Sequence, residues 1–319
     1  MTRYAMDVGR FVVESAYFTR ATLFSKPSRW LVFILLGLPW AALSSLMESR
    51  QILDGNIIHW ALVPWREAGL LIGAGVLCNL LVWGWIVRLF RKNPLPPEFD
   101  RPLSLCLDGI KAHTIPLVWI LVPEILAFIQ FTIAGSSTFS IILWPPDPAT
   151  IQILVLLAVE LVLFFYAVQY GLIGMIRFAR TGSVREAFAI LEIKRTFDRI
   201  GFVNYYLGFG VVVLSWLLFT FSLRGVALVP YAGPVIALCL GPVPVVFCSR
   251  FVAHFCDEDQ YSPATGNTRD TGAGTVSLPD GTGSLATEYA VWLAILAVLV
   301  VLCFTPLALI ITSVSRLIP

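Results

Sequence analysis

The stretch LPPEFDRPLSLCLDGIKAHTIPLVWILVPE, residues Leu95 to Glu124, decides the fold. A proline-stiffened acidic turn opens it, a segment with helical periodicity follows, and an apolar run ends it. In the middle segment, apolar and polar residues recur at steps of three and four, so the predicted helix has one apolar face and one polar face. The apolar face holds Leu103, Cys106, Leu107, Ile110 and Thr114, and the polar face holds Ser104, Asp108 and Lys111.

At about a dozen residues, this predicted helix is too short to cross a hydrocarbon core of about 30 Å, which needs about 20 residues. Two interpretations are open. The helix could lie in the plane of the lipid headgroups and lead into the apolar span that follows. Alternatively, it is an ordinary connecting helix that packs on the rest of the protein.

The composition predicts a polytopic membrane protein. Hydrophobic residues make up 58% and charged residues 13% of the 319 positions, against about 45–50% and about 25% in soluble domains. The apolar residues form blocks of span length, which predicts an all-α transmembrane helical bundle of about seven spans. The predicted spans are Trp30–Met47, Glu67–Val87, Thr114–Ala134, Ile151–Ile176, Phe202–Phe221, Ala227–Ser249 and Tyr289–Ile311.

Charge and cysteine usage exclude several other classes of protein. The net charge is +2 and the basic residues form no cluster, so no nucleic-acid partner is expected. The six cysteines suggest no disulfide framework, since none lies in a predicted outer loop. Cys248, His254 and Cys256 come nearest to metal-ligand spacing, but a zinc site needs four ligands, or three and an open position. We therefore expect no metal and no other cofactor.

Two more segments are amphipathic, which gives three predicted interfacial helices in all. Residues 1–28 are not a signal peptide, because a polar stripe interrupts them. That stripe holds Arg3, Asp7, Arg10 and Glu14, and the apolar stripe holds Tyr4, Val8, Phe11 and Phe18. In the third segment, Thr181–Gly201, the apolar face rotates midway, so we expect a bend near Glu192 to Lys194.

The distribution of basic residues predicts the orientation. Every Lys and Arg lies on one predicted side of the membrane, except Arg50, Arg66, Arg224 and Arg316. The positive-inside rule then places the N-terminus in the cytoplasm and the C-terminus on the outer side. We expect the membrane to be the plasma membrane. The same alternation suggests, as a hypothesis, a threefold repeat of an amphipathic helix and a helical hairpin, at about residues 1–94, 95–180 and 181–256.

Three domains are predicted along the chain. Residues 1–255 form a six-span membrane domain, and residues 288–319 add a C-terminal transmembrane helix. Between them, residues 256–287 are rich in Gly, Thr, Ser and Asp with little to bury. We expect these residues to be a disordered, acidic and polar cytoplasmic linker.

Several short phrases resemble those of DUF4013, a prokaryotic and mainly archaeal family of membrane proteins of unknown function. They are LPPEFD at residues 95–100, DGIKA at 108–112 before a span with Pro116 and Pro123, ARTGS at 179–183 with Ala187 and Phe188, and VPYAGP at 229–234. The resemblance covers about residues 5–256 and ends where the acidic linker begins. It implies an archaeal multi-pass membrane protein and gives no catalytic residues.

Glu124 and Glu160 are the candidate site, because both lie well inside predicted spans. Ionisable residues at that depth usually face the bundle interior or a polar cavity. The two carboxyl groups could share a proton and bind a cation or an amine. The alternative is a structural pair, hydrogen-bonded by neighbours, that helps two helices to associate.

Prolines mark the sixth predicted span as kinked or locally unwound, since each interior proline removes a backbone hydrogen bond. They are Pro230, Pro234, Pro242 and Pro244. Packing shape is one explanation, and a discontinuous helix that lines a transport site is the other.

No nucleophile elbow, phosphate loop or zinc-protease pattern is present. We therefore expect a non-enzymatic membrane scaffold or a subunit of a cell-envelope assembly, with the lipid bilayer and other membrane subunits as partners. A small transporter or permease that uses Glu124 and Glu160 is one alternative. A lipid-binding membrane domain that partners a separate enzyme is the other.

Overall fold

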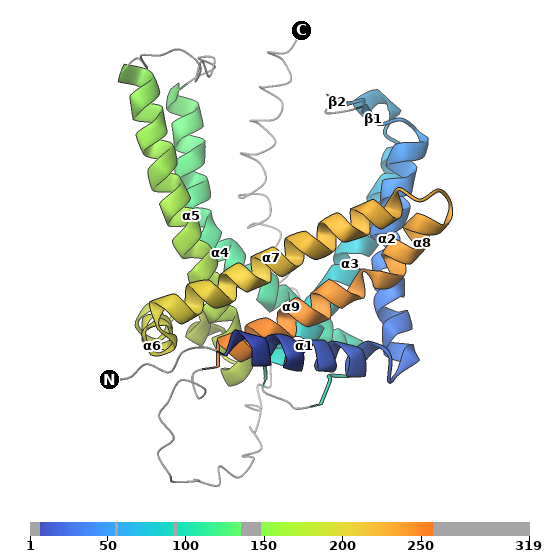
Figure 1. Ribbon diagram of the computed structural model, residues 1–319. Helices are drawn as coiled ribbons and strands as arrows, with labels where there is room; N and C mark the ends of the chain where they lie inside the picture. Colours follow the sequence, from blue (N-terminus) through green and yellow to red (C-terminus); the bar gives the residue numbers. More distant parts are fainter. Residues whose placement is uncertain (1–6, 55–56, 92–94, 135–147, 258–319) are drawn as a thin grey trace. The chain divides into compact units, whose positions relative to one another are not determined.

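The computed structural model describes residues 7–54, 57–91, 95–134 and 148–257. The chain divides into two compact units. Unit 1 joins residues 1–109 to residues 194–274, and unit 2 joins residues 110–193 to residues 275–319. Each unit is described by its own elements (Figure 1).

Unit 1 contains most of the helices. They are α1 (Val8–Leu23), α2 (Pro27–Ser49), α3 (Trp65–Phe90), the start of α4 (Pro102–Ala134), the end of α6 (Ile190–Ile200), α7 (Phe202–Ala227), α8 (Ala232–Leu240) and α9 (Pro242–Phe255). Two-residue strands, β1 (Leu53–Asp54) and β2 (Ile57–Ile58), pair antiparallel between α2 and α3, and the short 3-10 helix η1 (Trp60–Leu62) follows. Unit 2 contains the rest of α4, α5 (Pro148–Thr181), the 3-10 helix η2 (Val184–Phe188) and the start of α6.

The predicted helical membrane fold is confirmed. In the described residues, six stretches are long and apolar enough to cross a membrane: Pro27–Ser49, Trp65–Phe90, Pro102–Ala127, Val155–Thr181, Phe202–Ala227 and Ala232–Phe255. Each of these stretches overlaps one of the first six predicted spans. The predicted linker from residue 258 onward and the predicted seventh span, Tyr289–Ile311, lie outside the described residues.

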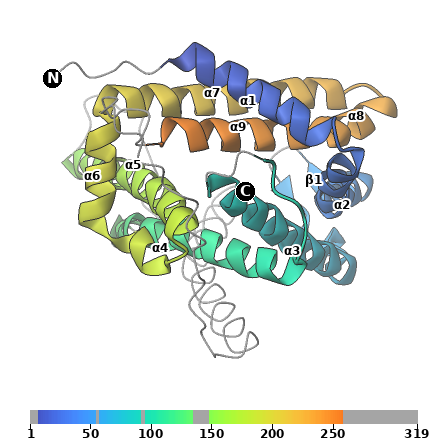
Figure 2. The ribbon, with the colours of Figure 1, turned by 90° about the horizontal axis from the view of Figure 1, so that it is seen from below.

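Helix α1 packs along α9 in unit 1, and Figure 2 shows the two side by side. The predicted apolar residues Phe11 and Phe18 are buried in this contact, together with Ser15 and Thr22. Phe11 meets Phe251 edge to face, with ring centroids 6.3 Å apart. The first amphipathic segment is therefore a separate helix held to the protein along its inner face.

Helices α3 and α4 cross at a pair of glycines. A Cβ atom on Gly84 would overlap the backbone carbonyl of Leu105, and a Cβ atom on Gly109 would overlap that of Leu80. The two contacts are reciprocal, because each helix offers a glycine to the backbone of the other. Small residues allow helices in membranes to approach this closely.

The second amphipathic segment differs from the expectation of a separate interfacial helix. It forms one continuous helix with the span that follows, since α4 runs from Pro102 to Ala134 with Pro116 and Pro123 inside it. Leu107 and Ile110 are buried as expected, but Leu103 is 72% exposed. The amphipathic pattern at the start of α4 therefore reflects a change in the surroundings of one continuous helix. It does not mark a break between two helices.

The third amphipathic segment breaks earlier than expected. The 3-10 helix η2 ends at Phe188, and α6 begins at Ile190. The bend therefore lies at Ala189, three residues before Glu192. Gly201, at φ 84°, then separates α6 from α7, a conformation that suits glycine because it has no Cβ atom.

The glycine crossing gives the first prediction. Gly84→Ala should lower the free energy of unfolding by at least about 1–3 kcal/mol, because the new methyl group cannot fit against a backbone carbonyl. Gly73→Ala is the matched control, since Gly73 lies on the same helix with no atom within 4 Å of its would-be Cβ. Thermal unfolding in detergent measures both variants. An equal midpoint for the two would contradict the close crossing.

Candidate functional site

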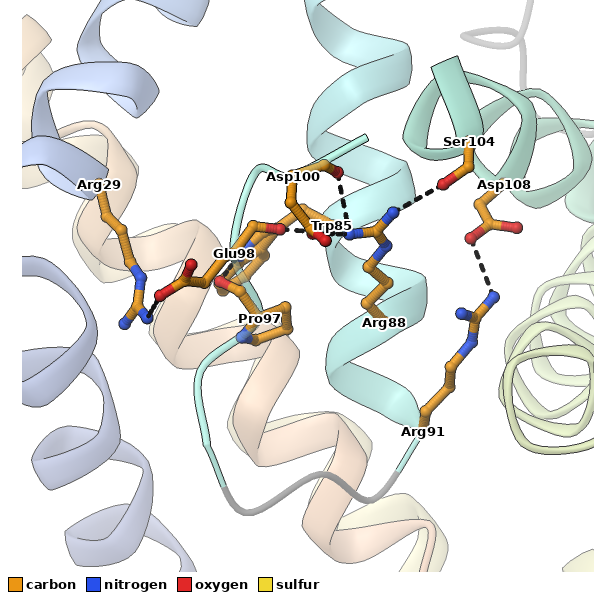
Figure 3. Close-up of polar contacts among 9 residues, drawn as sticks. All are labelled: Arg29, Trp85, Arg88, Arg91, Pro97, Glu98, Asp100, Ser104 and Asp108. Atoms are coloured by element: carbon orange, nitrogen blue, oxygen red, sulfur yellow. Dashed lines mark hydrogen bonds and ion pairs between the residues drawn. The ribbon is translucent and has the colours of Figure 1, made fainter. Parts of the chain in front are cut away.

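The loop at residues 95–101 lies against the ends of α2 and α3 in unit 1 (Figure 3). The indole Nε1 of Trp85 donates a hydrogen bond of 2.9 Å to the carbonyl of Pro97. The ring of Phe99 packs on Phe33 and Trp85, at centroid distances of 5.0 and 6.1 Å. Trp85 is fully buried, so the proline-stiffened turn is anchored on an aromatic core.

Glu98 joins this loop to the start of α2. Its carboxylate accepts from Lys26 Nζ at 2.6 Å and from Arg29 Nη2 at 3.1 Å. These hydrogen bonds, that of Lys26 first, hold the pKa of Glu98 below its usual range. The Arg29 side chain is only 11% exposed, whereas that of Glu98 is 60% exposed.

Arg88 joins the end of α3 to the loop and to the start of α4. Its guanidinium donates to the carbonyls of Glu98 and Asp100, at 3.3 and 3.1 Å, and pairs with the Asp100 carboxylate. The second amino group of Arg88 donates to Ser104 Oγ at 2.7 Å. One turn further along α3, Arg91 pairs with Asp108 of α4 at 2.9 Å.

We call Lys26, Arg29, Arg88, Arg91, Glu98, Asp100, Ser104 and Asp108 the charge clamp. Each of its acids pairs with a base on another element, and Arg88 reaches several acceptors at once. Planar, multidentate guanidinium contacts fix geometry better than single exposed ion pairs do. The chemistry that this arrangement supports is the joining of helix ends at one membrane boundary.

The sequence contained the parts of the charge clamp but did not show that they meet. The acidic turn at residues 95–100 and the basic end of the second span, Arg88 and Arg91, were both visible. Their opposite charges, 10 to 12 residues apart for Arg88 and its partners in the turn, were the signal for pairing. Lys26 and Arg29 lie about seventy residues away in the chain, and no local pattern connects them to Glu98.

A second set of polar contacts joins α1 to α9. Glu14 lies 3.6 Å from His254 Nε2, and the His254 ring stacks on Phe11 at 5.6 Å. Arg250 lies over the ring of Phe18, 4.5 Å from its centroid. Among the described residues, no three His, Cys, Asp or Glu side chains are grouped as metal ligands.

The sequence places Glu124 on α4 and Glu160 on α5, and Figure 1 shows these two helices side by side. The backbone of Pro116 faces Gly171, and Trp119 packs on Tyr170 at 5.1 Å. Continued along two antiparallel helices, this register brings Glu124 within about one turn of Glu160. The hairpin therefore carries the two carboxyl groups at similar heights.

Both glutamates are partly exposed and have apolar neighbours. Val122 and Leu161, close to them in sequence, are 59% and 67% exposed. In a membrane, a charged carboxylate facing the lipid tails would cost roughly 2.5–3.5 kcal/mol on insertion scales. The side of the hairpin that carries them therefore favours a polar or protein neighbour over lipid.

The four prolines of the sixth span occupy different places. Pro230 lies in the turn before α8, Pro234 in the first turn of α8, and Pro242 and Pro244 in the first turn of α9. The break between α8 and α9 falls at Gly241. In the last turn of α8, the carbonyl of Cys239 accepts a 2.8 Å hydrogen bond from Trp30 Nε1 of α2. The side chain of Trp30 thus supplies a hydrogen-bond donor to a backbone carbonyl next to the break.

Comparison with known proteins identifies the family. The profile described as "Protein of unknown function (DUF4013)" matches residues 68–230, which is just over half of the chain. The chain belongs to the DUF4013 family. The match includes the phrases at residues 95–100, 108–112 and 179–183, so these resemblances are confirmed. No curated protein and no solved structure matches the chain.

Membership of the DUF4013 family, together with six apolar helices among the described residues, indicates a multi-pass membrane protein. The matched residues contain most of the charge clamp and both intramembrane glutamates. The archaeal origin and the extension of the family resemblance to residues 5–67 and 231–256 stay predictions.

The Glu98 ion pairs give the second prediction. Because the folded-state pKa of Glu98 is lowered, its stabilisation is present above the unfolded pKa near 4.3 and is lost as the pH falls through the folded pKa. Glu98→Gln should lower the thermal midpoint at pH 7 by a small amount, on the order of 1 °C. The difference from the wild type should vanish in acid.

Glu48→Gln is the control for this measurement, since Glu48 is exposed at the other end of α2. Its midpoint should follow that of the wild type at every pH. A Glu98→Gln difference that persists unchanged at pH 3 would show that the ion pairs do not carry the effect.

Proposed function

We propose that this DUF4013 protein is a non-enzymatic membrane scaffold or a subunit of a cell-envelope assembly. A scaffold must hold its helix ends in fixed positions so that other subunits can contact them. The partners are the lipid bilayer and other membrane protein subunits.

The charge clamp is the observation that carries this proposal. In an active site, charged groups are commonly arranged with perturbed pKa values that suit proton transfer or binding of a ligand. In the clamp, Glu98, Asp100 and Asp108 pair with bases at the start of α2 and at the end of α3. The same use of charge recurs in unit 2, where Arg177 of α5 pairs with Glu186 of η2 at 2.6 Å. These contacts join elements to each other.

The apolar surfaces of two spans support the same proposal. Along α2, Phe33 is the buried residue, and along α7 the buried residues are Tyr205 and Gly208. Much of the surface of each helix is therefore available to lipid or to a neighbouring subunit. The assembly would lie in the plasma membrane, with the basic charge clamp on the cytoplasmic side under the positive-inside rule.

Native mass spectrometry tests this proposal as the third prediction. Protein extracted gently from its native membrane should carry other protein subunits at a fixed ratio. The ratio should persist in Glu48→Gln and fall in Arg88→Lys, because lysine cannot reproduce the several contacts of the Arg88 guanidinium. Circular dichroism would confirm that the helices of both variants are intact.

Two outcomes would contradict the scaffold. The first is a protein that carries only lipid at the mass of one chain. The second is a bound small molecule or ion that leaves when Glu124 and Glu160 are both replaced by Gln, which would favour a transporter.

A further inference from the structure

Helix α1 is apolar on two opposite faces. Its inner face buries Phe11 and Phe18 against α9. On the other side, Val13, Tyr17 and Phe24 are 52%, 67% and 54% exposed. They are four and seven residues apart, and these spacings place their side chains in one row along the helix. We call Val13, Tyr17 and Phe24 the outer stripe.

Arg20 lies within the outer stripe, three residues after Tyr17 and four before Phe24, and its side chain is exposed. Among the described residues, its guanidinium has no hydrogen-bonding or ion-pairing partner. An arginine lays its apolar stem along neighbouring apolar groups and keeps its charge in a polar environment. The outer stripe therefore presents a positive charge on an apolar surface.

Helix α1 lies across the direction of α2. Figure 1 shows α2 upright with α1 running across its lower end, and Figure 2 shows α2 nearly end-on with α1 seen along its length. Helix α2 is long and apolar enough to cross a membrane, and it begins at Pro27, four residues after α1 ends at Leu23. The rings of Phe24 and Trp30 pack at 5.5 Å across this turn. A helix that lies across the end of a membrane span runs along the membrane surface.

The outer stripe matches a lipid surface in both polarity and charge. A helix in the membrane interface places its apolar side chains at the boundary between headgroups and acyl chains, and its basic side chains at the phosphates. At the nearby start of α2, Lys26 and Arg29 pair with Glu98, whereas Arg20 is left for an external anion. The anion that lies beside apolar chains in a membrane is the phosphate of an anionic lipid.

We propose that α1 lies in the membrane interface, with its outer stripe at the boundary between headgroups and acyl chains and with Arg20 bound to the phosphate of an anionic phospholipid. Under the positive-inside rule, this lipid belongs to the cytoplasmic leaflet. The site rests on the proposed scaffold only in that it specifies the lipid partner. It needs a single chain and no other subunit.

Photocrosslinking to lipid tests this site as the fourth prediction. The photoreactive residue p-benzoylphenylalanine replaces Tyr17 in the full-length chain, which is reconstituted into nanodiscs with equal amounts of phosphatidylglycerol and phosphatidylcholine. After irradiation, the intact mass should show lipid adducts. Adducts of phosphatidylglycerol should outnumber those of phosphatidylcholine about fivefold, because one basic side chain favours an anionic surface by roughly this factor.

Two variants and a second probe position are the controls. Arg20→Gln should bring the ratio of the two adducts close to one, whereas Arg20→Lys should keep most of the preference because it keeps the charge. The control probe replaces Leu214 near the middle of α7, which is 58% exposed against 67% for Tyr17. It should give adducts of both lipids in equal amounts, with or without the change at Arg20.

Either of two results would overturn the site. Adducts from the Leu214 probe but none from the Tyr17 probe would place the outer stripe in water and leave it for a protein partner. A preference for phosphatidylglycerol that Arg20→Gln does not change would assign the anionic lipid to other basic residues. Neither result bears on the scaffold, since these nanodiscs contain no other subunit and native mass spectrometry tests the scaffold separately.

Discussion

The close crossing of α3 and α4 is the constraint on which the helix ends joined by the charge clamp depend. Gly84 lets the backbone of α4 approach, and Arg88 lies one turn further along the same face of α3. On α4, Gly109 directly follows Asp108. The glycines therefore set the distance between the helices, and that distance decides whether the guanidinium groups can reach Ser104 and Asp108. Van der Waals contact and charge pairing thus act together at one crossing.

Sequence alone predicted the parts of the fold that depend on burial along a single helix. Blocks of apolar residues predicted about seven spans, six of which fall within the described residues, because every backbone amide in a membrane must be paired within the helix. The sequence was less informative about helix ends where one helix passes from one environment to another. The start of α4 has an amphipathic pattern, yet the backbone continues unbroken through Pro116. A periodic pattern reports which face is covered, and it does not report where the helix ends.

The candidate residues show the same division. Glu124 and Glu160 could be selected from depth alone, because an ionisable residue far inside an apolar block is costly wherever it points. The charge clamp could not be selected in this way, since its residues look like ordinary loop charges. Lys26 and Glu98 meet only because α2 and α3 form a pair that returns the chain to the same boundary. Long-range contacts of this kind follow from tertiary structure and leave no local trace.

The break between α8 and α9 has a consequence for how α2 is held. A helix that ends inside a membrane leaves carbonyl groups without donors, and here the indole of Trp30 donates to one of them. Trp30 lies near the start of α2, one residue beyond Arg29 of the charge clamp. In an unbroken helix, these carbonyls would accept hydrogen bonds from amides of the same helix, and none would be left for a side chain of α2. The interruption at Gly241 therefore leaves a carbonyl of α8 free to accept a hydrogen bond from α2. That hydrogen bond fixes the rotation of α2 about its axis.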